Sequence, residues 1–172
     1  MKKSVLSTLL ILGVVLFNFG IDRYTKVLAV EHLEGKPTVQ VIGDFFILHF
    51  AENKGAFLSL GSTLGETGRF VLLAILPAIA LILGFGYLLW KQASLDRFHQ
   101  ICWASLIGGG LANIWDRLFN EGHVVDFMNF GIGSLRTGIL NVADLSITFS
   151  VLALFLVGLK KDTMLPEKKE PS

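Results

Sequence analysis

The sequence predicts an all-α integral membrane protein, a four-transmembrane-helix bundle with a small β-rich loop subdomain outside the membrane. Charged residues make up only 17% of the chain, against about 25% in soluble domains. They are nearly absent from four apolar runs, at about residues 4–21, 70–90, 100–119 and 138–159. Each run is close to the roughly 20 residues that a helix needs to cross a bilayer. Backbone groups in lipid must be paired within their own segment, so we expect these runs to be helices of a single membrane domain.

The first run has a possible alternative as a cleavable signal peptide. It follows Lys2 and Lys3 and is apolar from Ser4 to Ile21, which is also the pattern of a secretory leader. The residues that follow are polar and charged, beginning with Asp22, and they do not form a small-residue cleavage site. We therefore expect a retained span.

The next runs carry two features that bear on helix packing. The run Phe70–Trp90 has no charge but contains Pro77, which predicts a local irregularity that a membrane helix tolerates. The third run contains Gly108, Gly109 and Gly110, whose lack of side-chain bulk predicts a close approach of neighbouring helices.

The connection between the first two spans, residues 22–68, is too long for a simple turn. Within it, Val39–Ile42 and Phe45–Phe50 are rich in branched and aromatic residues on either side of a Gly-Asp pair. This pattern predicts two short strands around a turn. The tail, residues 160–172, is polar and predicted to be disordered in the cytoplasm.

The orientation follows from the distribution of lysine and arginine. Four spans place both termini on one side, with eight of these residues there and seven on the other side. The counts barely differ. Because the eight lie in short terminal or loop segments, we expect the termini to be cytoplasmic.

The polar residues of the spans gather at the membrane face opposite the termini. Asn113, Asp116 and Arg117 close the third span at i, i+3 and i+4, and Asn141 and Asp144 open the fourth at i and i+3. Each set is expected to share one helix face. Ionisable groups in a membrane are costly and usually face the bundle interior or water. For Asp116 and Arg117, a helix-locking ion pair and a functional role remain equally open.

Further polar residues are expected at the same face. The first span ends at Asp22, with Lys26 one turn later, and the connecting loops hold Asn53 and Asp126. An interfacial boundary position is enough to explain Asp22 and Lys26.

Two of these acids suggest a reaction. Asp126 lies among the apolar residues of Val124–Met128, and Asp144 lies about one turn into an apolar helix. If the two carboxylates are close in a low dielectric, one of them keeps a proton. Such a pair supplies a base to activate water and an acid to protonate a leaving amine, which is aspartyl-protease chemistry. Separate structural pairings of the two acids remain the alternative.

Other classes of function have less support. The four histidines lack the spacing of a zinc site, and one cysteine excludes a multi-cysteine metal site. A net charge of +1 gives no argument for nucleic acid. A small transporter is a rival, but a proton relay favours carboxylates at several depths. A non-catalytic lipid-binding subunit is a second rival.

Five stretches, taken in order, resemble the lipoprotein signal peptidase (signal peptidase II) family of bacterial prolipoprotein-processing aspartyl proteases. They are Asp22–Lys26, Glu52–Phe57, Gly108–Arg117, Val124–Phe127 and Asn141–Ile147. Each motif alone is weak, but the ordered set spans nearly the whole chain and is specific. Ala112 and Leu140 depart from the glycine and phenylalanine that are usual in the family, and they change only the bulk beside the motifs.

The resemblance implies an aspartic endopeptidase whose catalytic pair is Asp126 and Asp144. It implies that the following residues shape the site or hold substrate: Asp22, Lys26, Asn53, Gly55, Asn113, Arg117, Asn141 and Ala143. Asp116, Gly109 and Gly110 are assigned structural roles. The implied reaction removes a signal peptide just before a diacylglyceryl-modified cysteine, in the plane of the bacterial inner membrane.

The same resemblance sets the expected partners. They are lipid-modified prolipoproteins and membrane phospholipid, with no cofactor, no metal and no nucleic acid, and the protein is expected to be a monomer. The loop 22–68 corresponds to the extracytoplasmic β-cradle of the family. The aromatic residues Phe57, Trp115, Phe127 and Phe130 are available to line an opening toward lipid, although ordinary interfacial positions also explain them.

Overall fold

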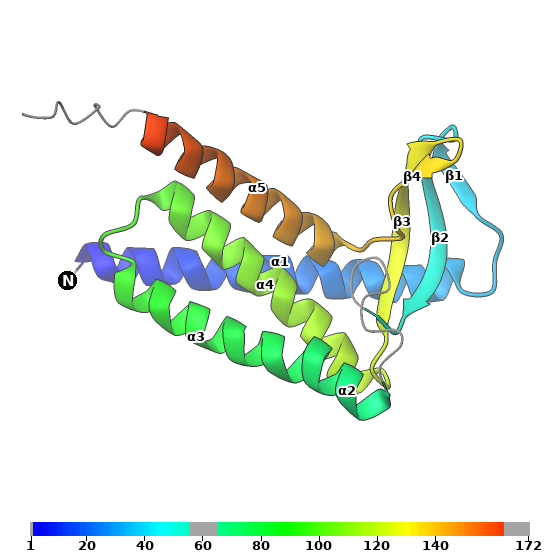
Figure 1. Ribbon diagram of the computed structural model, residues 1–172, viewed down its shortest axis with the longest axis horizontal. Coiled ribbons are helices and arrows are strands. Elements are labelled where there is room, and N and C mark those ends of the chain that lie inside the picture. The colour runs from blue at the N-terminus through cyan, green and yellow to red at the C-terminus, as the bar shows by residue number, and fades with distance from the viewer. Residues whose placement is uncertain (1, 56–64, 164–172) are drawn as a thin grey trace, which may run out of the picture.

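The long helices lie side by side, and a small sheet lies across one end of them (Figure 1). The computed structural model describes residues 2–55 and 65–163. Its long helices are α1 (Lys2–Leu33), α3 (Leu76–Lys91), α4 (Arg97–Phe119) and α5 (Val142–Thr163). Helix α4 packs against the other three and therefore forms the centre of the bundle.

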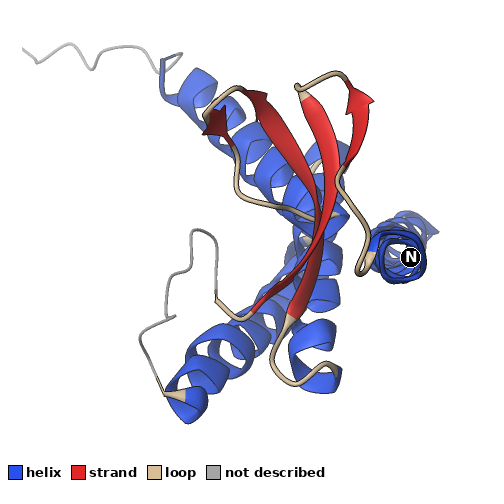
Figure 2. Cartoon of the chain, turned by 90° about the vertical axis from the view of Figure 1, so that its right-hand side faces the viewer, coloured by secondary structure: helices blue, strands red, loops and turns tan. Residues whose placement is uncertain are grey.

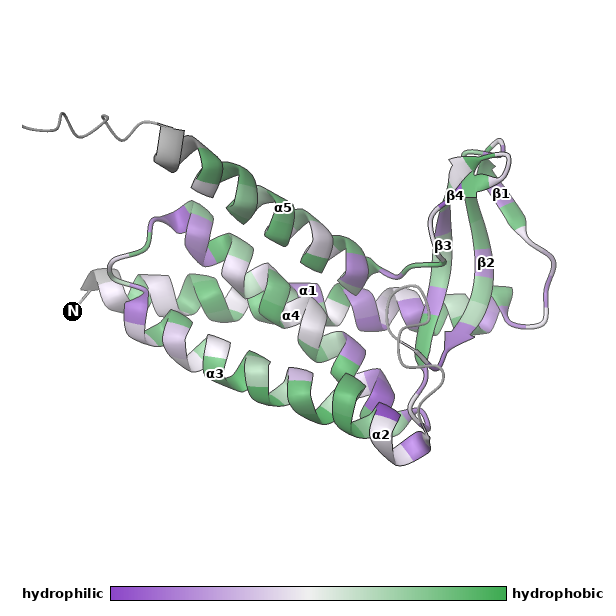
Figure 3. Cartoon of the chain, in the orientation of Figure 1, coloured by the Kyte–Doolittle hydropathy of each residue, from purple (hydrophilic) through white to green (hydrophobic). Residues whose placement is uncertain are grey.

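Three helices in the described part of the chain are long and apolar enough to cross a membrane. They cover Ser4–Leu33, Glu66–Lys91 and Val142–Leu159. The predicted number of four spans is therefore not confirmed. The helix that falls short is α4, because its glycines and its polar residues lower its mean hydropathy. Figure 3 shows hydrophilic residues at both ends of the helices, including the end that meets the sheet, with mostly apolar residues between them.

Helix α1 is longer than the sequence suggested. It continues beyond Ile21 to Leu33, so Asp22 and Lys26 lie within the helix and not at the start of a loop. The extension has a physical reason in the packing of Ala29 and Leu33, which are buried against Val125 and Phe127 of the sheet. Figure 2 shows α1 passing along one side of the sheet.

The irregularity predicted at Pro77 is a turn of π-helix. The short helix α2 (Glu66–Phe70) leads into the π-turn η2 (Val71–Ile75), which continues directly into α3 with Pro77 in its first turn. Proline has no backbone N–H to donate to the preceding turn, and its ring clashes with the carbonyl four residues earlier. The wider turn accommodates both effects without ending the helix.

The sheet is antiparallel, in the order β1-β2-β3-β4. Strands β1 (Val39–Ile42) and β2 (Phe46–Asn53) confirm the two predicted strands. Strands β3 (Val124–Ile132) and β4 (Leu135–Arg136) were not predicted. Asn53 and Asp126 were predicted to lie in connecting loops, and this was wrong: Asn53 ends β2 and Asp126 lies in β3, two residues from its start.

The three adjacent glycines of α4 each face a different helix. A side-chain carbon on Gly108 would lie 2.6 Å from the Val15 oxygen of α1, and one on Gly109 would lie 2.8 Å from the Ala143 oxygen of α5. On Gly110 it would lie 2.6 Å from a Leu81 methyl carbon of α3. The predicted close approach of the helices is confirmed.

The bounds of the fourth predicted span also differ from expectation. Helix α5 begins at Val142, not near residue 138, and it continues to Thr163. The tail was predicted to be disordered from residue 160, and this was wrong for residues 160–163, because they belong to α5. Residues 164–172 lie outside the described part of the chain.

Candidate active site

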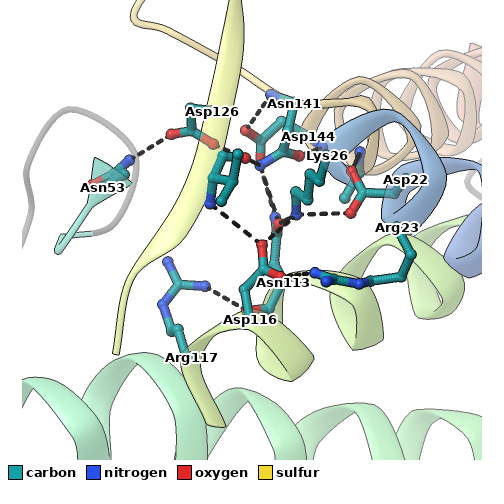
Figure 4. A network of polar contacts seen from close by, with 12 residues as sticks. Asp22, Arg23, Lys26, Asn53, Asn113, Asp116, Arg117, Asp126, Asn141 and Asp144 are labelled. Atoms are coloured by element: carbon teal, nitrogen blue, oxygen red, sulfur yellow. Dashed lines mark hydrogen bonds and ion pairs between the residues drawn. The ribbon is translucent and has the colours of Figure 1, made fainter. Parts of the chain in front are cut away.

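The polar residues singled out in the sequence converge at the end of the bundle that meets the sheet. Figure 4 shows side chains from α1, α4, β2, β3 and α5 joined by hydrogen bonds and ion pairs. The structure brings together these expected residues: Asp22, Lys26, Asn53, Gly55, Asn113, Asp116, Arg117, Asp126, Asn141, Ala143 and Asp144. Gly109 and Gly110 lie further along α4, in the helix contacts described above.

A buried lysine lies at the centre of the network. The Lys26 side chain is 1% exposed, and its Nζ atom lies 2.7 Å from an Asp22 oxygen and 2.8 Å from an Asp116 oxygen. It also donates a 2.9 Å hydrogen bond to the Asn113 side chain. Arg23 pairs with the other oxygen of Asp116. Two carboxylates and two cations thus neutralise one another, as buried charges require. Asp22, Lys26 and Asp116 are buried, whereas the Arg23 side chain is 30% exposed.

Asp22 and Asp116 hold the two segments that carry the catalytic candidates. Asp22 accepts a 2.8 Å hydrogen bond from the backbone N–H of Ala143, in the first turn of α5. Asp116 accepts one of 3.3 Å from the backbone N–H of Val125, next to Asp126. A carboxylate is well suited to the helix position, because N-terminal N–H groups lack partners within the helix.

Asn141 and Asp144 form a reciprocal cap at the start of α5. The side chain of Asn141 accepts from the Asp144 N–H at 2.9 Å, and the Asn141 N–H donates to the Asp144 carboxylate at 3.2 Å. The expectation that both residues share a helical face was therefore wrong, since Asn141 precedes the helix. Their spacing of three residues is that of a capping box.

Asn141 also links the two candidate catalytic acids. Its side-chain amide donates to Asp126 at 2.6 Å, while its backbone N–H donates to Asp144. Asn53 donates to the second oxygen of Asp126, and Asn113 donates to the second oxygen of Asp144, each at 2.9 Å. Every carboxylate oxygen of the pair therefore has an amide donor that fixes its direction.

Asp126 and Asp144 line one cavity of about 430 Å³. Asn53, Gly55 and Asn113 border the same cavity, whose volume is in the usual range for ligand sites. Arg117 lies beside them and donates to the backbone oxygens of Gly55, at 3.0 Å, and Asn113, at 3.2 Å. The two acids thus face a shared space that is large enough for part of a peptide.

The environment of Asp126 favours its protonated form. Burial raises the pKa of this carboxyl to about 6, and the negative charge of Asp144 acts in the same direction. The hydrogen bonds from Asn53 and Asn141 lower the pKa, but they offset only part of the effect of burial. A carboxyl with such a pKa can both accept and return a proton near neutral pH.

Three of the aromatic residues considered for an opening toward lipid do not surround the two acids. Trp115, Phe127 and Phe130 do not line the cavity that contains the two acids. Phe127 is buried, Phe130 stacks on Phe46 within the sheet, and Trp115 packs against aromatic residues of α1 and α4. Phe57 lies outside the described residues.

Two features of the site were missed in the sequence. Arg23 lies within the motif Asp22–Lys26, but no role was predicted for it. Its position next to Asp22 is a signal for an ion pair at the end of the bundle. The donation from Val125 to Asp116 depends on a backbone group, which residue types do not reveal. Across residues 2–55 and 65–163, no group of three or more histidine, cysteine or acidic residues is arranged to hold a metal ion.

The chain is similar in sequence and structure to a set of bacterial membrane enzymes. A family model described as signal peptidase (SPase) II matches residues 14–160. A lipoprotein signal peptidase of Treponema denticola is 40% identical over 128 residues, which are 72% of this chain and 73% of that protein. One of Leifsonia xyli subsp. xyli is 38% identical over 165 residues, or 90% of this chain and 69% of that protein.

Solved structures support the same comparison. A bacterial membrane enzyme determined by the in meso method at 2.3 Å resolution superposes with a TM-score of 0.75 at 28% identity, covering 100% of this chain and 96% of the other. A second, determined by the same method at 1.9 Å, superposes with a TM-score of 0.73 at 26% identity. It covers 93% of this chain and 94% of the other.

Proposed function

The chain belongs to the signal peptidase II family, and from this premise we propose that it is an intramembrane aspartyl endopeptidase of lipoprotein maturation. Its substrates are diacylglyceryl-modified prolipoproteins, from which it removes the signal peptide by cleaving before the lipidated cysteine. The observation that carries the proposal is the pair formed by Asp126 and Asp144, which line one cavity and are linked through Asn141.

The reaction uses the two acids as a unit that holds one proton. The ionised carboxylate takes a proton from water as the water oxygen adds to the scissile carbonyl, and the protonated carboxyl gives its proton to the leaving amine. The raised pKa of Asp126 supports the sharing of a proton at neutral pH. Interacting acids titrate jointly, so the two roles belong to the pair and not to one named residue.

The neighbouring polar groups position the acids and the peptide. Asn53, Asn113 and Asn141 hold the carboxylate oxygens in fixed directions, which supports a preorganised site. Arg117 borders the cavity beside Gly55, where it is suited to polarise or bind a substrate carbonyl. Asp22, Lys26 and Ala143 act one layer further out, by holding the start of α5 against α1 and α4.

We place the protein in the bacterial inner membrane as a monomer in contact with phospholipid. Helix α4 also spans the membrane, as the third of four spans, and is shielded from lipid on several sides by the helices that pack against it. The termini are cytoplasmic, and the catalytic cavity lies near the extracytoplasmic face with the sheet outside the membrane. A lipid-anchored substrate then reaches the site by lateral diffusion.

Cleavage of a purified lipidated prolipoprotein tests this function. We expect wild-type protein to release the signal peptide, with no effect of chelators. Asp126→Asn and Asp144→Asn should each lower the rate at least about 10³-fold, because each removes one member of the acid–base pair. Asp96→Asn is a matched control at the other end of α4, where asparagine preserves the helix cap.

The outcomes are distinct. Full activity of a folded Asp126→Asn or Asp144→Asn protein rejects the catalytic pair. Loss of activity in Asp96→Asn would mean that the assay reports general damage. Inactivity of the wild type toward every lipidated prolipoprotein tested rejects the function itself.

A further inference from the structure

A second cavity, of about 500 Å³, lies beside the catalytic cavity and shares two cationic side chains with it. Lys54 and Arg117 line both cavities. The second cavity lies between the α2–η2 segment and the end of α4, and Arg69 of α2 adds a third cation. The proposed cleavage chemistry makes no use of this space.

The cations of the second cavity have no carboxylate partner within ion-pair distance among the described residues. Among the described residues, Arg117 donates to two backbone oxygens and to no side chain, and Arg69 is half-buried like Arg117. Two acids also border the cavity, Glu66 and Glu121, but both are exposed to solvent. Half-buried guanidinium groups without a carboxylate favour binding of an anion.

Much of the remaining wall of the cavity is apolar. Phe70, Leu73 and Leu118 line it, beside Gly122 and His123, and Phe70 and Leu73 belong to a helix that is long and apolar enough to cross a membrane. The cavity therefore suits a molecule with an anionic end at the membrane surface and an apolar body in the lipid.

Peptide cleavage at the neighbouring acids produces such a molecule. The oxygen of water bonds to the carbonyl carbon, the C–N bond breaks, and the amine leaves with a proton. The released signal peptide then ends in a carboxylic acid, which ionises at neutral pH. This carboxylate forms next to Asp126 and Asp144, whose negative charge repels it, while Lys54 and Arg117 attract it from the shared wall.

We propose that the second cavity binds the C-terminal carboxylate of the cleaved signal peptide through Lys54, Arg69 and Arg117. This inference rests on the proposed function. It gives the enzyme a path for product away from the catalytic pair, a step that limits turnover in many enzymes. A phospholipid headgroup has related chemistry, but it is not generated at the wall that the two cavities share.

Direct binding of a synthetic signal peptide tests the proposal without turnover. A fluorescent peptide with a free C-terminal carboxylate is bound to the full-length protein in detergent and displaced by the unlabelled acid or by its C-terminal amide. For the wild type we expect the acid to bind about tenfold more tightly, as for hydrogen bonds to a charged group. Arg69→Gln should remove most of this preference, and Arg69→Lys should retain it.

Arg97→Gln is the matched control, because it makes the same change at the start of α4, whereas the second cavity lies at the other end of this helix. It should keep the wild-type preference for the acid. Equal binding of acid and amide by the wild type overturns the proposal, and so does an unchanged preference in Arg69→Gln. Arg69-dependent displacement of acid and amide alike by phosphatidylglycerol also overturns it and identifies a lipid site. Failure of the proposed function appears separately, as a lack of prolipoprotein cleavage.

Discussion

The ionisation of Asp126 is shifted by its burial in the site. Burial gives its carboxyl a pKa of about 6 in the folded protein, against about 3.9 in an unfolded chain. The folded state therefore binds this proton more tightly. Its contribution to stability is complete below about pH 4 and is lost as the pH rises through about 6.

This residue yields a prediction that does not depend on catalysis. Relative to Asp126→Asn, the free energy of unfolding of the wild type should fall between about pH 4 and 6, by about 3 kcal/mol. Above pH 6 the two curves should run parallel. Chemical denaturation in detergent across this range measures the difference, and an unchanged difference from pH 4 to 7 would show that Asp126 is not desolvated.

Residue types in the sequence were sufficient to select the acids and amides of the site, but not their contacts. Asn141 and Asp144 were selected by their spacing, yet their actual relation is a cap and not a shared face. The link from Asn141 to Asp126 depends on a strand that the sequence did not reveal. Long-range pairing decided these contacts, and local pattern carries no information about it.

At the scale of elements, strand β3 shows why part of the fold escaped prediction. Residues Val124–Phe130 read as an apolar stretch with two polar interruptions, Asp126 and Asn129, and both interruptions are buried. A strand with one face in water alternates apolar and polar residues. Because β3 is buried on both faces through Asn129, it lacks that alternation and looked like a loop between spans.

The helices were predicted better because a membrane imposes their length and composition. Their contacts were predictable only where small residues marked them, as at Gly108–Gly110. Gly108 is the clearest example. A side-chain carbon there would meet the backbone of α1 at Val15, and no side-chain rotation could relieve that clash.

We therefore predict that Gly108→Ala destabilises the protein by about 1–3 kcal/mol, the usual cost of overpacking. The matched control is Gly84→Ala in α3, where an added carbon meets nothing within 4 Å. Alanine at that position should be neutral or stabilising by up to about 1 kcal/mol. Thermal unfolding in detergent compares the two variants, and equal stability of both would mean that α1 and α4 do not approach as closely as described.

For the whole molecule, the number of spans decides whether the two ends of the bundle lie on the same side of the membrane or on opposite sides. The sheet lies at one end of the bundle, and the connection between α3 and α4 lies at the other (Figure 1). If α4 crosses the membrane, these two regions face opposite compartments. Helix α4 can do so despite its lower hydropathy because α1, α3 and α5 pack around it, and its polar residues Gln100, Asn113 and Asp116 are buried.

We predict that Ser134→Cys, in the turn between β3 and β4, reacts with a membrane-impermeant thiol reagent in intact cells stripped of their outer envelope. Ser94→Cys, between α3 and α4, should react only after the membrane is permeabilised. Both are made in a Cys102→Ser background, which removes the single native thiol. Labelling of both positions from one side would remove α4 as a span, and labelling of Ser94→Cys alone would invert the orientation. The inverted result would place the proposed catalytic pair at the leaflet opposite to the one in which we propose that a lipid-anchored substrate presents its cleavage site.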